Sequence, residues 1–300
     1  LPAHISAGEE YSDVLTYRER LMKDNAADSR RLGRLYDRHM KKVEAQYPNG
    51  IPPLDETGAT PQLPKPAPTL QRQMDHLQER IQQRRKLIVS AFEAYLEKHP
   101  QDWQALNDFG SYLYYNGDPD RAGKVWQQAV DLAPEEPEPH NNLGIYCSHF
   151  GEPLKAVDEF RTAIRLNEEN PDYHFNLATM YCTKRYKVQE REGWDLETVF
   201  WHSQEEYQRA WELAPENFRF AKNCFQNYYM AHFFGVKNVE SKAIDACKRA
   251  LEMELTPDQR VYVLTHIGRI YRGLNNLNQA RHWLEKALTI NENATVAKHL

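Results

Sequence analysis

Membrane-spanning, disulfide-bonded and turn-rich β architectures find little support in this sequence. No run of about 18 apolar residues occurs in the 300-residue chain, so none of its segments is expected to cross a membrane. The four cysteines are too few and too scattered for a disulfide framework. Glycine is scarce at 13 residues, whereas tyrosine reaches 17 and tryptophan 6. This balance favours helices that pack through aromatic side chains.

Motifs for catalysis and for nucleotide binding are also missing. The sequence contains no glycine-rich phosphate loop, no dinucleotide-binding fingerprint and no nucleophile elbow. His202, Glu205 and Glu206 lack the second histidine of a zinc-binding motif, so we interpret them as a solvated helix face. The formal net charge of −5 argues against a nucleic-acid partner. We therefore expect no enzymatic activity, no cofactor and no metal ion.

The cysteines and the first residue bear on the compartment. All four cysteines lie among apolar residues, which is typical of buried free thiols and weakly favours a reducing, cytoplasmic setting. Cys224 and Cys247 fall on facing helices of one predicted hairpin, so a disulfide between them is an alternative. The chain begins at Leu1 rather than at methionine, so export or an anchor upstream stays open.

The chain before residue 101 divides into three parts. Residues 1–47 are predicted to form a helical arm, and residues 48–68 form an extended linker that holds seven of the 17 prolines. Residues 69–100 are predicted to form a long helix or capping half-repeat, with an apolar seam that is interrupted at Arg84. The seam residues are Leu70, Met74, Leu77, Ile81, Ile88, Ala91 and Tyr95. The seam either holds the arm within the chain, which is the simpler interpretation, or joins two protomers.

A repeat of 34 residues begins after residue 100. Residues of the same or similar type recur at this spacing in six pairs: Gly110 and Gly144, Gly117 and Gly151, Ala122 and Ala156, Trp126 and Phe160, Ala129 and Ala163, and Leu132 and Leu166. The small residues let two helices approach closely, and a large side chain such as Phe160 fills the remaining gap. This pattern resembles the tetratricopeptide repeat (TPR), a helix–turn–helix unit of about 34 residues.

The resemblance implies an all-α fold in which about five units stack into an α-solenoid. This right-handed superhelix would occupy residues 101–300, with the repeat pattern itself covering residues 101–293. The third unit has 13 inserted residues near Lys184–Glu197, which we interpret as a loop that the scaffold does not need. The fourth has six extra residues around Phe234–Val239, and Phe225 replaces the small residue, so its hairpin is expected to be splayed or shifted.

The resemblance also implies a concave groove lined by the first helix of each unit. Asparagine recurs at inward positions of these helices, and some family members use such a ladder to pair with an extended peptide backbone. Basic residues take equivalent positions in the fourth and fifth units, whereas the charge set of members that clamp a carboxylate is not supported. The predicted groove residues are Asn107, Asn142, Asn176, Asn223, Arg219, Lys222, Arg269 and Arg272.

Two other features belong to the repeats. His140 and His174 occupy the same position of consecutive units and are interpreted as packing residues at the edge of the core. Residues 101–172 carry five lysines and arginines against fourteen aspartates and glutamates. This acidic block is either a solvated face or a surface for a basic partner.

Taken together, the repeats favour a non-catalytic scaffold for protein–protein interaction that binds a peptide or partner segment in the concave groove. The alternative is a structural module for self-assembly, in which the N-terminal arm and the seam form a homo-oligomer. Neither hypothesis involves nucleic acid or a membrane span within this chain.

Overall fold

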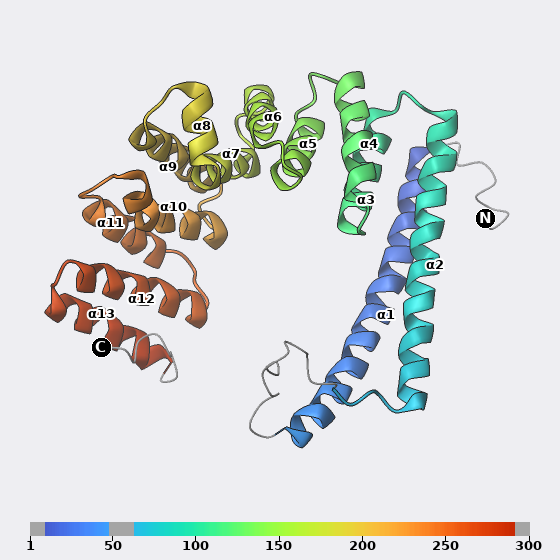
Figure 1. Ribbon diagram of the computed structural model, residues 1–300, viewed down its shortest axis with the longest axis horizontal. Coiled ribbons are helices and arrows are strands. Elements are labelled where there is room, and N and C mark those ends of the chain that lie inside the picture. The colour runs from blue at the N-terminus through green and yellow to red at the C-terminus, as the bar shows by residue number, and fades with distance from the viewer. Residues whose placement is uncertain (1–9, 48–62, 292–300) are drawn as a thin grey trace, which may run out of the picture. The chain divides into compact units, whose positions relative to one another are not determined.

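The computed structural model describes residues 10–47 and 63–291, and all regular secondary structure within them is helical (Figure 1). This confirms the prediction of an all-α fold. None of the described helices has both the length and the apolar character needed to span a bilayer. Most of the predicted linker and the chain end lie outside the described residues. The chain divides into two compact units, residues 1–125 and 126–300, which we describe separately.

The first unit contains three helices and the beginning of a fourth. They are α1 (Tyr11–Gln46), α2 (Pro68–Lys98), α3 (Trp103–Tyr115) and α4 (Pro119–Leu132), and the boundary between the units falls within α4. Pro68 can begin α2 because the first turn of a helix leaves its N–H groups without partners. The side chain of Asp102 caps α3, since its carboxylate accepts a hydrogen bond from the Ala105 N–H at 3.0 Å.

The apolar seam of α2 packs against α1, so it has a partner within the chain. Val14, Leu21 and Leu35 are buried on α1 and are separated by seven and fourteen residues, so they share one face of the helix. Leu35 clusters with Met74 and Leu77 of α2. This packing agrees with the simpler of the two interpretations of the seam.

An ion pair explains why the seam is interrupted at Arg84. Asp28 continues the seven-residue stripe of α1 and is buried. Its Oδ2 accepts a hydrogen bond from Arg84 at 2.6 Å and lies 3.1 Å from Arg80. A buried carboxylate needs such partners, so this pair fixes which turns of α1 and α2 face each other.

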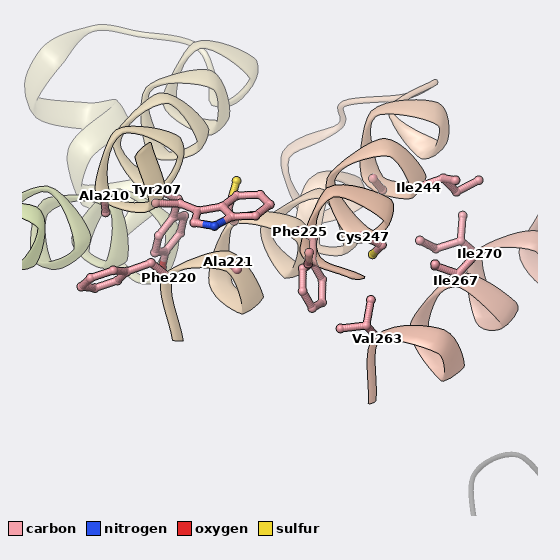
Figure 2. Close-up of a cluster of buried hydrophobic side chains, with 14 of the residues drawn as sticks. Tyr207, Ala210, Phe220, Ala221, Phe225, Ile244, Cys247, Val263, Ile267 and Ile270 are labelled. Carbon is pink, nitrogen blue, oxygen red and sulfur yellow. The ribbon is translucent and has the colours of Figure 1, made fainter. Parts of the chain in front are cut away.

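The second unit is a stack of helix hairpins, which is the arrangement that the 34-residue repeat predicts. Its helices are α5 (Pro137–His149), α6 (Pro153–Leu166), α7 (Pro171–Thr183), α8 (Arg185–Glu192), α9 (Leu196–Leu213), α10 (Phe218–Met230), α11 (Glu240–Leu251), α12 (Pro257–Gly273) and α13 (Leu277–Ile290), with a short 3-10 helix, η2 (Ala231–Phe234), after α10. One apolar core joins α7 and α9 through α10 and α11 to α12 (Figure 2). Because each hairpin buries its apolar face on the next, no single repeat is expected to be stable alone.

Close helix packing at the repeated small position is visible in two hairpins. A Cβ atom added to Gly144 of α5 would lie 2.6 Å from the ring of Phe160 in α6. A Cβ atom added to Gly268 of α12 would lie 2.5 Å from the side chain of Leu284 in α13. Phe160 and Leu284 occupy the same gap-filling position of their repeats, so the pairing of a glycine with a large side chain recurs.

In the fourth hairpin the large side chain stands on the first helix and the small one on the second, the reverse of the other two hairpins. Phe225 stands at the small position and is fully buried, whereas Cys247 stands at the gap-filling position (Figure 2). The Phe225 ring packs toward α12, where its centroid lies 5.3 Å from that of His266. Cys224 and Cys247 are both free, so the alternative of a disulfide is not realised. Burial raises the pKa of the Cys224 thiol to about 12, which keeps it protonated at neutral pH.

The insertion of the third repeat is a helix, so the prediction that it forms a loop is wrong. Residues 185–192 form α8, whose Val188 is fully buried. Arg191 donates to the Leu154 carbonyl at 3.0 Å, and Glu192 accepts from Arg161 at 2.9 Å. The insertion therefore docks on α6 of the preceding hairpin. Two local signals mark its end, because Gly193 ends α8 with a φ of 69° and the next helix begins with a capping aspartate.

Replacing residues 184–197 by a short turn is expected to lower the free energy of unfolding by about 1.5–3 kcal/mol or more, because Val188 and the ion pairs of α8 are lost. Val188→Ala should reproduce part of this loss, whereas Lys187→Ala changes an exposed side chain of the same helix and should not. Urea unfolding followed by circular dichroism measures all three variants. Equal stability of the shortened chain and the wild type would show that α8 contributes nothing to the fold.

Candidate peptide-binding groove

The predicted asparagines lie on the first helices of successive hairpins, but they are less solvated than the sequence suggested. Asn142 on α5, Asn176 on α7 and Asn223 on α10 are each half-buried. Asn176 donates to the side-chain oxygen of Asn141 at 2.8 Å, and Asn223 donates to a backbone carbonyl within its own helix at 2.8 Å. Each of these two amides uses one N–H in this way, which leaves a second N–H and the oxygen for a ligand.

Asn107 differs from the other three. It lies on α3 in the first unit, and only 5% of it is exposed. An asparagine buried to this extent contributes to the interior of its unit and not to a surface that binds a peptide. The prediction that Asn107 lines the groove is therefore not supported by its burial.

Two of the predicted cations share a pocket near the start of α10. Arg219 and Lys222 line it together with Asn223, and its volume is about 600 Å³. The guanidinium of Arg219 lies 4.0 Å from the ring centroid of Phe175, and the ammonium of Lys222 lies 5.0 Å from that of Tyr262. Contacts of this kind hold long cationic side chains in place over aromatic faces.

The other two predicted cations line a second pocket. Arg269 and Arg272 lie near the end of α12, beside a cavity of about 670 Å³. Tyr229 and His232 line the same cavity, and 57% of Tyr229 is exposed. Tyr229 takes the same position of its repeat as Arg272 does, so the repeat register places it on the groove face. His232 was missed, although the six extra residues of the fourth repeat pointed to this end of the hairpin.

His140 and His174 form the same buried network in consecutive repeats. The Nδ1 of each ring lies 2.6 Å from a carboxylate oxygen, of Glu159 for the first and of Glu206 for the second. The Nε2 atoms lie 3.0 and 2.9 Å from backbone carbonyl oxygens. The partners are 19 residues apart in one repeat and 32 in the other, and this difference of 13 residues equals the insertion. The histidines are therefore packing residues, as interpreted, with a specific polar role.

Both networks favour the protonated imidazole, because both ring nitrogens face oxygen acceptors. Burial lowers the pKa of His174, but the hydrogen bonds to Glu206 and to the Glu168 carbonyl outweigh it, so the pKa is raised above its ordinary value. The same balance, with Glu159 as the carboxylate, raises the pKa of His140. The nearby cations Arg165 and Arg209 act in the opposite direction on their respective histidines without reversing the shifts.

These shifts predict a pH-dependent stability. A raised folded-state pKa stabilises the protein fully below the unfolded value of about 6.5, and the contribution is lost as the pH rises through the folded value. Glu206→Gln should remove about 1.5–3 kcal/mol at pH 6 and less at higher pH. Urea titrations between pH 6 and 8.5 measure this, with the exposed Glu205→Gln as the matched control. Parallel pH profiles for wild type and Glu206→Gln would contradict the assignment.

His202 and Glu205 do not form the start of a metal site. Their side chains lie 3.8 Å apart on the helix surface, and the His202 ring packs on Trp194 with centroids 4.3 Å apart. Among the described residues, no group of three histidine, cysteine or carboxylate side chains is arranged to hold a metal ion.

Two family models described as tetratricopeptide repeat match the sequence, one at residues 89–137 and 107–171 and the other at residues 261–293. The chain contains tetratricopeptide repeats. The TPR matches leave out the segment from 172 to 260, which holds both insertions, although the structure forms helix hairpins there too. No curated protein sequence matches this TPR chain.

Solved structures with the TPR fold resemble this chain. YrrB, described as a TPR protein with an unusual peptide-binding site, is 20% identical, with 70% of this chain and 97% of its own covered and a TM-score of 0.52. PilW, described as a type IV pilus biogenesis factor, is 15% identical, with 76% and 94% covered and a TM-score of 0.52. MamA is 17% identical, with 66% and 96% covered and a TM-score of 0.50. At these identities the likeness shows the shared fold alone.

Proposed function

We propose that this TPR protein is a non-catalytic scaffold that binds an extended segment of a partner protein along the first helices of its second unit. The observation that carries the proposal is the pair of pockets beside α10 and α12. Both are lined by cations at the predicted positions, and both are large enough to take side chains of a peptide. A TPR neighbour described as having a peptide-binding site gives the proposal a precedent at the level of the fold.

The chemistry of these helices suits a peptide. Amides such as those of Asn176 and Asn223 can pair with the N–H and C=O groups of an extended backbone, which every partner sequence offers. Lys222 and Arg269 add positive charge that would favour acidic side chains next to that backbone. Arg219 contributes less, because it lies 3.5 Å from Asp172 and shares its pocket with Glu216 and Glu254. The amides thus supply affinity that does not depend on the sequence of the bound peptide. The cations supply a preference for peptides with acidic side chains.

Self-assembly through the N-terminal arm is the weaker candidate. The residues that would form the interface, such as Met74 and Leu77, are buried against α1 of the same chain. A second protomer would have to displace α1 to reach them. Light scattering of the full chain is expected to give the mass of a monomer.

A peptide selection tests the scaffold proposal. Peptides selected from a random display library on the immobilised protein would be titrated against the wild type by fluorescence anisotropy. Neutralising two groove cations in Arg219→Gln/Lys222→Gln should weaken binding about tenfold or more. Lys248→Gln/Arg281→Gln removes the same charge from exposed positions of second helices and should leave binding unchanged. Failure to select any peptide, or equal weakening by both pairs, would count against the groove.

A further inference from the structure

A pocket in the first unit contains none of the predicted groove residues. It is formed by α2, α3 and the start of α4, and its volume is about 370 Å³. Three cationic side chains line it, Arg85, Lys86 and Arg121, with Asp118 as the one carboxylate. Tyr112 lines it as well, beside apolar side chains such as Val89. Nothing in the repeat pattern requires a positively charged pocket at this place.

The hydroxyl group of Tyr112 has no partner in the part of the chain that the structure describes. Only 6% of Tyr112 is exposed, and its buried oxygen makes no hydrogen bond there. Buried polar atoms are nearly always paired, because an unpaired one loses its bonds to water without replacement. Because Tyr112 also lines the pocket, a small shift of its side chain would let this hydroxyl donate a hydrogen bond to a ligand bound there.

Arg85 is the second group available to a ligand. It is half-buried, and no carboxylate among the described residues pairs with it. Arg85 and Tyr112 line the same pocket, and the charge of Arg85 opposes the rise that burial causes in the pKa of Tyr112. The Arg85 guanidinium has no carboxylate partner in the described part of the chain, so it is available to an anion that enters the pocket.

The charges around the pocket leave a positive excess, with Arg85 and Lys86 as the cations that have no carboxylate partner in the part of the chain that the structure describes. Arg121 is engaged, since its guanidinium contacts Glu93 at 2.5 Å. Asp118 accepts from the backbone N–H of Arg121 at 3.4 Å, so its charge is placed at the N-terminus of α4. Arg85 and Lys86 have no such partner among the described residues. Two unpaired cations match a phosphate group, which carries about 1.5–2 negative charges at pH 7.

We propose that this pocket binds a phosphate group, with the Tyr112 hydroxyl and the Arg85 guanidinium donating to its oxygens and Lys86 adding charge. The pocket is larger than a bare phosphate needs, so the group is carried by a larger molecule. That molecule is either a small phosphate ester or a phosphorylated side chain of a partner protein. This site shares no lining residue with the two pockets of the proposed groove.

Binding of two probes tests the site on the full chain. Inorganic phosphate and a short phosphoserine peptide would be titrated by calorimetry against the wild type, Tyr112→Phe and Arg85→Gln. Both variants are expected to bind about tenfold more weakly or worse. Arg20→Gln removes the same charge from an exposed position of α1 and should bind as the wild type does. Tighter binding of the phosphopeptide than of phosphate, with none of its unphosphorylated form, identifies a partner protein as the source. Binding of inorganic phosphate without binding of the phosphoserine peptide identifies a small phosphate ester as the source.

A stability measurement keeps the site testable if the variants differ in folding. Without ligand, Tyr112→Phe should melt at the same temperature as the wild type or higher, because the hydroxyl has no bond to lose. Phosphate should raise the melting temperature of the wild type more than that of Tyr112→Phe. With phosphate present, the wild type should therefore melt at the higher temperature. Saturable binding of neither probe, equal binding by all variants, or a lower melting temperature of ligand-free Tyr112→Phe would each overturn the proposal.

Discussion

Replacing Gly144 by leucine is expected to destabilise the second unit by about 1–3 kcal/mol or more. Even a single added carbon would lie 2.6 Å from the Phe160 ring, and leucine adds three further carbons to it. The ring is fully enclosed, so it cannot move aside without disturbing its own neighbours. Thermal or urea unfolding followed by circular dichroism measures the change.

Gly33 supplies the matched control for this substitution. It also lies inside a helix, α1, but no atom comes within 4 Å of the position that its Cβ would take. Gly33→Ala should therefore stabilise the protein by about 0.5–1 kcal/mol, because alanine restricts the unfolded chain more than glycine does. Opposite signs for Gly144→Ala and Gly33→Ala would show that helix contact, and not helix propensity, decides the first result.

A double variant separates overpacking from other causes. Phe160→Ala alone should cost about 3–5 kcal/mol, because it opens a cavity in the hairpin. Combined with Gly144→Leu, it should cost less than the sum of the two, since the leucine fills part of that cavity. The fourth hairpin, with Phe225 and Cys247 in exchanged sizes, shows that the fold accepts such an arrangement. If the double variant lost as much free energy of unfolding as the two single variants together, the result would contradict a contact between positions 144 and 160.

The spacing of small and large residues predicted the hairpins because it encodes a contact that each repeat must make. Gly144 and Phe160 are as far apart in the sequence as Gly268 and Leu284, because both pairs make the same contact within their repeats. When the same contact recurs in consecutive repeats of equal length, the small and the large residues each recur at the period of the repeat. The 13-residue insertion could be measured for the same reason, and the His174–Glu206 pair confirms its length. Its structure was missed, because the eight residues of α8 are strongly polar and only Val188 reports its burial.

Contacts between distant segments were beyond the sequence. Asp28 sits on the stripe of α1 at a regular seven-residue step, but only the packing of α1 on α2 shows that Arg84 is its partner. The repeat register predicts that Asn142, Asn176 and Asn223 fall on the first helices of their hairpins, but it does not predict their burial, which depends on neighbours such as Asn141 in the adjacent repeat. The pocket beside Tyr112 left no signal in the repeat, because Arg85 and Lys86 come from α2, before the 34-residue pattern begins.

Removing the groove asparagines together is expected to weaken a bound peptide by about ten- to a thousandfold. Each lost pair between an amide and the peptide backbone should cost about 0.5–1.5 kcal/mol, and three such losses add to this range. The variant is Asn142→Ala/Asn176→Ala/Asn223→Ala. Asn176 and Asn223 also bond within the chain, so a modest loss of stability is expected as well. Circular dichroism must therefore show that the variant is folded at the temperature of the assay.

The central claim is that the first helices of the second unit bind an extended peptide, and one titration tests it most directly. A selected peptide would be titrated by fluorescence anisotropy against the wild type, the triple asparagine variant and a matched triple variant. The matched variant, Gln128→Ala/Asn278→Ala/Gln279→Ala, removes three exposed amides from second helices. We expect affinity to fall at least tenfold for the groove variant and to stay unchanged for the matched one. Undiminished binding by the folded groove variant would contradict the claim.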